Sequence, residues 1–573
     1  MEVIKHEGPG RLGGVVRLGG DYSFRTPALV GIDFTLSPFN SFFHPKEPGE
    51  YDFNLAPSIP LGFYTPDEVI QKAIGRLWSV NYEGFNAFYF PALRRTEYLG
   101  EFFKIIERHN FDAVYLGNSK ILIKEYRYFV RILRELRERF PNIMIITDLE
   151  PFFYPLAVYL GVDAFDTRSL KLYDFEGKGF TQFSPFLWSS EPNSLDFARE
   201  VILLVRKALE EGKLRYLVEN FFPTQYNAGI LRIADLEHPD YLEKYTPIQK
   251  ETVYFISDAS IRRPEVKRWH ERVLERFTPP KNVELLLLFP CSAKKPYSFS
   301  RSHTLYRRAV KEALGSGISK VHELILTSPF GVVPREWEWL AKYDIVVTGH
   351  WSEEEIKPAA ELLAKTLEKY PEEIPIVAHL DEAYVEIAKL ASELSRREII
   401  FTDVKNGTTS HESLRSLTET LREFQIEGTK EDRTYRYFEN IRKVFDFYFG
   451  IGAGGEAILP DNGQVKGSKM LRIFVDGQQT GTFKDGVISV TPYGMQRIYD
   501  AVKSYWVKID FELRGGDVFA VGVEEADPRI RPDDIVGIVR DEKVVGVGKA
   551  VLNGGEEMVR AKKGVAVKVR KRA

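Results

Sequence analysis

Apolar and polar positions in residues 1–249 alternate in a pattern typical of parallel βα units. Short continuous apolar runs predict buried strands, and stretches with apolar residues three and four positions apart predict amphipathic helices. The predicted strands are Ala87–Phe90, Ala113–Leu116 and Ile143–Thr147. The predicted helices are Glu68–Trp78, Leu99–Glu107 and Tyr126–Phe140. This order predicts either a (β/α) barrel or an open parallel sheet.

A second β-α-β block covers residues 250–424. Its predicted strands are Leu285–Phe289, Leu324–Thr327, Ile345–Thr348, Ile374–Ala378 and Ile399–Thr402. Its predicted helices are Leu305–Leu314, Ile356–Tyr370, Ala383–Leu394 and Ser413–Phe424. Because ligands bind beyond the carboxyl ends of such strands, the polar residues at those ends are candidates for a site. They are Cys291, Ser328, His350, His379, Asp381, Asp403 and Lys405.

The pattern changes again after a charged break at Glu427–Arg433. Segment Tyr435–Ile451 is aromatic and helical, and short alternating runs with turn residues between them predict an all-β region from about residue 466. A chain of 573 residues has the length of roughly three to four domains. We predict four: 1–249, an α/β domain; 250–424, an α/β core domain; 425–495, a small α+β domain; and 496–573, a small β domain.

The charge balance excludes a uniformly basic nucleic-acid-binding surface, because 79 basic and 82 acidic residues give 79 − 82 = −3. The single cysteine, Cys291, excludes a disulfide within the chain and a cysteine-rich zinc site, and we predict no metal. The low number of Cys and Met residues is typical of proteins from thermophiles. No apolar run reaches about 18 residues and the first residues lack signal-peptide character, so we expect a cytoplasmic protein without a membrane span.

The densest polar cluster is the segment from Pro290 to His303, which follows a predicted buried strand and leads into a helix. Two lysines, Lys294 and Lys295, and the helix N-terminus favour the thiolate of Cys291, which is a competent nucleophile. His303 suits proton transfer near neutral pH. The alternative is that Cys291 is a small core residue under a solvated loop, which is the commoner situation for a lone cysteine after an apolar strand.

Two further segments carry candidate binding residues. In Thr327–Trp337, prolines and a glycine favour a rigid loop that presents Ser328 and Arg335, and an arginine can hold a phosphate or carboxylate with two hydrogen bonds. A structural turn with a surface arginine remains the alternative. The carboxyl-terminal segment is basic and without acidic residues from Met558 onward, which suits an RNA backbone. Its candidate RNA-binding residues are Arg560, Lys562, Lys563, Lys568 and Arg570.

The last 75 or so residues resemble a PUA domain, an RNA-binding pseudobarrel, through Gly515–Val523, Ile530–Asp533, Val547–Ala550 and Lys563–Arg570. Residues 425–495 look like the small domain that precedes PUA in archaeal tRNA-guanine transglycosylases. The amino-terminal region resembles a degenerate transglycosylase (β/α) barrel through Arg25–Pro27, Gly161–Asp166 and Leu214–Glu219. Those enzymes hold zinc through three cysteines and a histidine, and this chain has one cysteine.

The spaced motif Pro290-Cys291, Lys295-Pro296-Tyr297, Ser300 and His303 resembles the signature of archaeosine synthases, and Thr327–Arg335 fits that family as well. The resemblance implies a tRNA-modifying transferase whose substrate is tRNA carrying 7-cyano-7-deazaguanine (preQ0) at position 15 of the D-loop. It implies addition of an amine to the nitrile, with L-lysine favoured as donor and glutamine possible. It implies no cofactor, a tRNA partner and, for lysine addition, a radical-SAM partner enzyme. We also expect a homo-oligomer.

For this chemistry we predict that Cys291 adds to the nitrile to give a thioimide, which the amine then displaces. His303 would move protons, while Tyr297 and Ser300 would hydrogen-bond the developing imide anion. Lys294, Ser328 and Arg335 would bind substrate. In the alternative mechanism Cys291 is structural, and the amine adds directly to a nitrile polarised by His303 or Lys295. Two other functions stay open: a transglycosylase that exchanges guanine, and a non-catalytic tRNA-binding subunit.

Overall fold

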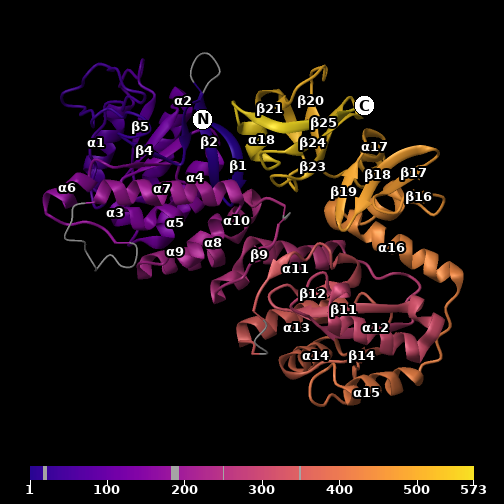
Figure 1. The fold of residues 1–573 in the computed structure, drawn as a ribbon. Helices are drawn as coiled ribbons and strands as arrows, with labels where there is room; N and C mark the ends of the chain where they lie inside the picture. Colours follow the sequence, from indigo (N-terminus) through magenta and orange to yellow (C-terminus); the bar gives the residue numbers. More distant parts are fainter. Residues whose placement is uncertain (17–21, 182–192, 249–250, 347–349) are drawn as a thin grey trace. The chain divides into compact units, whose positions relative to one another are not determined.

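The computed structural model describes residues 1–16, 22–181, 193–248, 251–346 and 350–573 (Figure 1). The chain forms two compact units. The first consists of Met1–Ile248, Lys508–Asp534 and Lys549–Val569. The second consists of Gln249–Val507, Ile535–Gly548 and Arg570–Ala573.

A five-stranded parallel sheet lies in the amino-terminal part of the first unit (Figure 1). In sheet order the strands are β4 (Ala28–Val30), β8 (Ala164–Asp166), β7 (Met144–Thr147), β6 (Ala113–Gly117) and β5 (Ala87–Pro91). The helices between them include α1 (Asp67–Leu77), α2 (Leu99–His109), α3 (Ser119–Leu122), α4 (Tyr126–Arg139) and α5 (Tyr154–Tyr159). The βα alternation is confirmed, and the barrel closure that the transglycosylase resemblance implied stays a prediction.

An antiparallel sheet and a group of helices complete this part of the unit. The sheet consists of β1 (Glu2–Glu7), β2 (Gly10–Val16) and β3 (Tyr22–Thr26). The helices are α6 (Leu170–Phe175), α7 (Ser194–Glu211), α8 (Leu214–Asn220), α9 (Gln225–Glu237) and α10 (Pro239–Tyr245).

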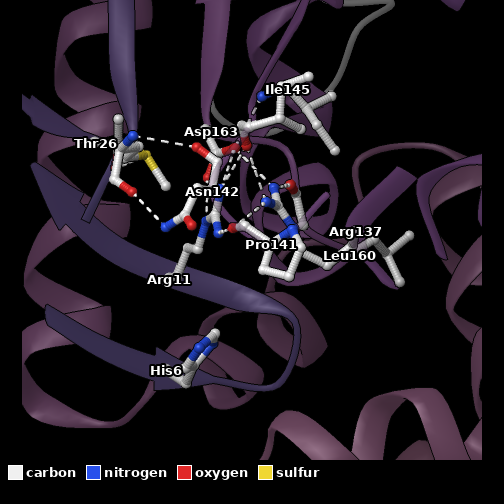
Figure 2. Close-up of polar contacts among 12 residues, drawn as sticks. His6, Arg11, Thr26, Arg137, Pro141, Asn142, Ile145, Leu160 and Asp163 are labelled. Atoms are coloured by element: carbon white, nitrogen blue, oxygen red, sulfur yellow. Dashed lines mark hydrogen bonds and ion pairs between the residues drawn. The ribbon is translucent and has the colours of Figure 1, made fainter. Parts of the chain in front are cut away.

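A buried cluster of two arginines and one aspartate joins the antiparallel sheet to the parallel sheet (Figure 2). Arg11 on β2 donates through Nε to Asp163 Oδ1 at 2.8 Å, and Arg137 on α4 donates through Nη2 to Asp163 Oδ2 at 2.7 Å. The amide of Ile145 on β7 donates to the same carboxylate at 2.9 Å. Burial raises the pKa of Asp163, but Arg11 and Arg137 outweigh it and hold that pKa below its usual value. The carboxylate is therefore ionised and links three elements.

The second unit contains a five-stranded sheet in the order β12-β11-β10-β14-β15. The strands are β12 (Gly331–Pro334), β11 (Val321–Thr327), β10 (Leu285–Pro290), β14 (Ile376–Ala378) and β15 (Ile400–Phe401). Every residue of β10 is buried, which explains its uninterrupted apolar sequence. Strand β12 is antiparallel to β11 and the other neighbours are parallel. The surrounding helices are α11 (Pro264–Arg276), α12 (Arg301–Leu314), α13 (Glu353–Leu367), α14 (Glu382–Ser395) and α15 (His411–Arg422).

The strand predicted at Ile345–Thr348 is wrong over its described part. The strand found there is β13 (Tyr343–Asp344), which pairs in parallel with β9 (Val253–Tyr254) in a separate two-stranded sheet. Ile345 and Val346 follow that strand, and Val346 is 83% exposed. Because β9 pairs only over two residues, the apolar run loses its partner after Asp344. Residues 347 and 348 lie outside the described residues.

Two further sheets follow α16 (Lys430–Phe449) (Figure 1). The first is antiparallel and consists of β16 (Gln464–Lys466), β17 (Leu471–Val475), β18 (Gln478–Lys484) and β19 (Val487–Val490). Helix α17 (Pro492–Val502) leads to a six-stranded sheet. In sheet order it consists of β21 (Val518–Phe519), β25 (Val565–Arg572), β24 (Lys543–Ala550), β23 (Ile535–Arg540), β20 (Trp506–Ile509) and β22 (Val523–Ala526). Among the described helices, none has the length and apolar character needed to cross a membrane.

Candidate active site

The only cysteine lies at the carboxyl edge of the sheet in the second unit. The parallel register pairs Pro290 with Leu326, and the Cys291 amide donates to the carbonyl of Leu326 at 3.0 Å. Cys291 therefore lies directly beyond β10 and next to the end of β11, where Ser328 follows. This is the position at which parallel sheets bind ligands, and it brings Cys291 and Ser328, two of the strand-end candidates, to the same sheet edge.

Both residues line a cavity of about 480 Å³. This volume lies within the range of roughly 300–1,000 Å³ usual for small-molecule sites. The described lining is partly aromatic and aliphatic and partly polar, with two carboxylates. It consists of Phe255, Ile256, Ser257, Asp258, Ser260, Ile261, Cys291, Ser328, Pro329, Ile345, Val346, His350, Trp351, Glu355 and Tyr384.

Tyr384 on α14 makes the side-chain contact with the thiol. Its hydroxyl oxygen lies 3.1 Å from Cys291 Sγ, and either atom is able to donate. The phenol is buried, and its ring packs edge-on against Trp351 with ring centroids 5.1 Å apart. Burial, and after it the neighbouring Cys291, raise the pKa of Tyr384. No sequence pattern indicates this residue, because 93 positions separate it from Cys291.

Lys295 lies in the loop that follows β10, four positions after Cys291. Its Nζ lies 4.0 Å from the centroid of the Tyr343 ring. This nitrogen is buried, and among the described residues it has no hydrogen-bond partner. Burial lowers the pKa of Lys295, and the opposing influence of Cys291 and Asp344 is smaller. Lys295 is therefore more readily neutral than an ordinary lysine. Lys294, in contrast, is exposed.

Tyr297 and Ser300 have partners away from the cavity. The Tyr297 hydroxyl lies 2.6 Å from the Tyr343 hydroxyl, which in turn contacts Thr327 Oγ1. Ser300 is the N-cap of α12, where its hydroxyl accepts from the amide of His303 at 3.2 Å. These contacts position the loop between β10 and α12. The predicted roles of both residues at an imide anion stay predictions.

His303 and Arg335 form a largely buried network, and neither residue lines the cavity. Arg335 donates through Nη2 to His303 Nδ1 at 2.9 Å, so the ring proton is on Nε2, which donates to the Pro290 carbonyl at 3.1 Å. Arg335 also forms ion pairs with Glu323 and with Glu338. Burial and Arg335 lower the pKa of His303 to about 3. Both ring nitrogens and the guanidinium are thus engaged inside the protein, which favours a positioning role for the pair.

The other strand-end candidates separate into cavity and non-cavity residues. Ser328 donates to Glu355 Oε1 at 2.5 Å, and Glu355 also belongs to the capping box of α13. His350 lines the cavity and is exposed. His379 is fully buried with both ring nitrogens bonded, to Thr402 and Thr408. Asp381 precedes α14, and Asp403 and Lys405 form an exposed ion pair at 2.8 Å.

The predicted RNA-binding residues divide into two groups. Arg560 donates to the Glu138 carbonyl at 3.3 Å, Lys562 Nζ donates to Asn110 at 2.9 Å, and Lys563 Nζ pairs with Asp112 at 3.1 Å. These three cations therefore make contacts within the first unit. Lys568 and Arg570 are exposed, and they lie on the same face of β25 because they are two positions apart.

Comparison with known proteins places this geometry in a family. The chain is 96% identical over 572 residues to the archaeosine synthase subunit alpha of Thermococcus kodakarensis, and the alignment covers 100% of both chains. It is 31% identical over 518 residues to the archaeosine synthase of Methanocaldococcus jannaschii, covering 86% of this chain and 84% of that one. The chain belongs to the archaeosine synthase family.

Two family models match parts of this archaeosine synthase family member. A domain of unknown function (DUF5591) matches residues 266–421, which include Cys291, Lys295 and Tyr384, and a PUA domain matches residues 507–572. The tRNA-guanine(15) transglycosylase of Methanobrevibacter smithii is 25% identical over 401 residues, covering 66% of this chain and 54% of that one. The predicted archaeosine synthase resemblance and the PUA domain are confirmed.

Proposed function

We propose that this chain acts in archaeosine biosynthesis by adding an amine to the nitrile of preQ0 at position 15 of the tRNA D-loop. The observation that carries the proposal is the position of Cys291, the only thiol, in a ligand-sized cavity at the carboxyl edge of a parallel sheet. Membership in the archaeosine synthase family supports the substrate, and the PUA match supports RNA binding. A tRNA substrate fits a cytoplasmic reaction.

The nitrile carbon is electrophilic, and a sulfur nucleophile adds to it to give a thioimide, which divides one difficult step into two. Cys291 is the nucleophile in this proposal. Lys295 is the group that takes a proton from the incoming ammonium, because its lowered pKa makes the neutral amine accessible. In the second route Cys291 is structural and Lys295 polarises the nitrile for direct addition. His303 is less suited to that task, since both its ring nitrogens are engaged.

The donor we favour is L-lysine, with glutamine nitrogen as the alternative. Among the described lining residues the acidic side chains are Asp258 and Glu355, and none is a lysine or arginine, which suits a cationic amine more than a neutral amide. A lysine adduct needs a further enzyme to cleave it, and we propose a radical-SAM partner. The name of the Thermococcus relative, a subunit alpha, also fits a partner subunit. Self-association stays a prediction.

The test is nucleoside mass analysis of preQ0-tRNA after incubation with the pure protein and lysine or glutamine. Formation of an amidine adduct with one donor supports the proposal, exchange for guanine would indicate a transglycosylase, and an unchanged tRNA would indicate a non-catalytic RNA-binding subunit. Cys291→Ser should lose nearly all adduct formation while keeping tRNA affinity. Ala293→Ser, which adds a hydroxyl to an exposed neighbour in the same loop, is the matched control. Near-normal adduct formation by Cys291→Ser would leave only the direct route.

A further inference from the structure

The hydroxyl of Tyr384 is placed for chemistry at the thiol and not only for packing. It lies 3.1 Å from Cys291 Sγ, and both residues line the cavity. The ring is held between the protein interior and Trp351, so the hydroxyl is directed by packing as well as by its hydrogen bond. Tyr384 is on α14 and the thiol is at the end of β10, so their meeting depends on the packing of two separate elements.

The other polar groups around the loop have different partners. His303 is bonded to Pro290 and Arg335, and the Tyr297 hydroxyl is bonded to Tyr343. The Nζ atom of Lys295 lies over the Tyr343 ring. Within the described residues, Tyr384 is therefore the hydroxyl that contacts the reacting sulfur and also faces the cavity.

We propose that Tyr384 is a catalytic proton relay between the Cys291 thiol and the nitrile nitrogen of the substrate. This inference rests on the function proposed above and assigns a residue that the sequence motif does not contain. In the addition step the S–H bond breaks and the S–C bond forms, while one π bond of the nitrile breaks. The thiol proton passes to the Tyr384 oxygen as the Tyr384 proton passes to the nitrile nitrogen, giving a neutral thioimide.

The second step uses the same relay in reverse. The nitrogen of the incoming amine forms a bond to the thioimide carbon, and the C–S bond breaks. The proton released by the amine nitrogen returns through Tyr384 to the sulfur, which restores the thiol and leaves the amidine. Tyr384 gains one proton for each one that it gives, so it does not accumulate as a tyrosinate. Burial that raises its pKa is compatible with this role, since the relay never requires the ionised phenol.

The experiment compares the wild-type protein, Tyr384→Phe and the control Tyr437→Phe, which removes a hydroxyl from an exposed ring on α16. The rate of amidine formation on preQ0-tRNA should fall by about 10² or more in Tyr384→Phe, because positioned proton transfer contributes roughly 10²–10⁴-fold. The affinity for tRNA should be unchanged. Alkylation by iodoacetamide, followed by mass spectrometry, should still modify the single cysteine, which shows that the thiol is present and accessible. Tyr437→Phe should match the wild type.

A second variant, with 3-fluorotyrosine at position 384, keeps the shape and the hydrogen bond and makes the phenol more acidic. Its rate of amidine formation at a fixed pH should differ from that of the wild type, because the rate of a proton transfer depends on the acidity of the group that transfers the proton, a change that a packing role would not cause. Tyr384→Phe activity within a few-fold of the wild type, or an unchanged rate in the fluorinated protein, would overturn the relay. If the wild type itself forms no amidine, the proposed function has failed. If the wild type forms amidine and Tyr384→Phe does so equally, only the relay has failed.

Discussion

Replacement of Asp163 by asparagine should open the parallel sheet of the first unit, because two buried arginines would lose their counter-charge. The carboxylate accepts hydrogen bonds from Arg11 at 2.8 and 3.1 Å, from Arg137 at 2.7 Å and from the Ile145 amide at 2.9 Å (Figure 2). All three charged side chains are fully buried. Removal of one partner from such a pair costs about 3–5 kcal/mol. Since about 1.4 kcal/mol is tenfold in an equilibrium constant, the opening equilibrium should rise by roughly 10²–10⁴.

Hydrogen exchange of peptides that contain β7 and β8 measures this opening locally, without assuming that the whole chain unfolds in one step. The matched control is Asp196→Asn, which removes an exposed carboxylate from an Arg199 pair of 3.0 Å and should leave exchange unchanged. The pKa of Asp163 is lowered in the fold, so its contribution should persist above the unfolded value of about 4 and decline only below it. An exchange rate changed by less than tenfold at neutral pH would refute the reasoning.

Two further predictions concern the site loop and the RNA surface. The pKa of His303, about 3 in the fold against 6.5, predicts that the unfolding free energy falls as pH drops from 6.5 towards 3, because the unfolded chain takes up a proton first. Denaturant titrations at several pH values should show that the unfolding free energy depends less steeply on pH in His303→Gln than in the wild type. An equal pH dependence would contradict the buried neutral ring. The double change Lys568→Ala and Arg570→Ala should weaken tRNA binding and reduce the slope of log affinity against log salt by roughly 1–2. Lys563→Ala removes an ammonium that pairs with Asp112, so it should reduce that slope less. Equal effects on the slope would contradict the division of the basic residues into those engaged within the first unit and those exposed on β25.

The sequence determined the elements that depend on local pattern. The run Leu285–Phe289 predicts a buried strand because every side chain of a central parallel strand faces a covered layer, and β10 is that strand. The same rule placed Cys291 and Ser328 at one sheet edge, since parallel neighbours end together. The rule fails for Ile345–Val346, because an apolar run forms a strand only where a partner continues beside it, and β9 ends at Tyr254.

Only the tertiary structure decided which side chains reach the thiol. Tyr384 comes to Cys291 through the packing of α14 against the sheet, a contact between residues 93 positions apart that no local period records. The sequence predicts that His303 and Arg335 act on the substrate. In the structure their polar atoms bind each other, and Arg335 also pairs with Glu323. Likewise the basic carboxyl-terminal segment predicts RNA-binding roles for Lys562 and Lys563, and in the fold their ammonium groups contact Asn110 and Asp112. Residue type fixes what a side chain is able to donate or accept, and long-range packing fixes the partner that it meets.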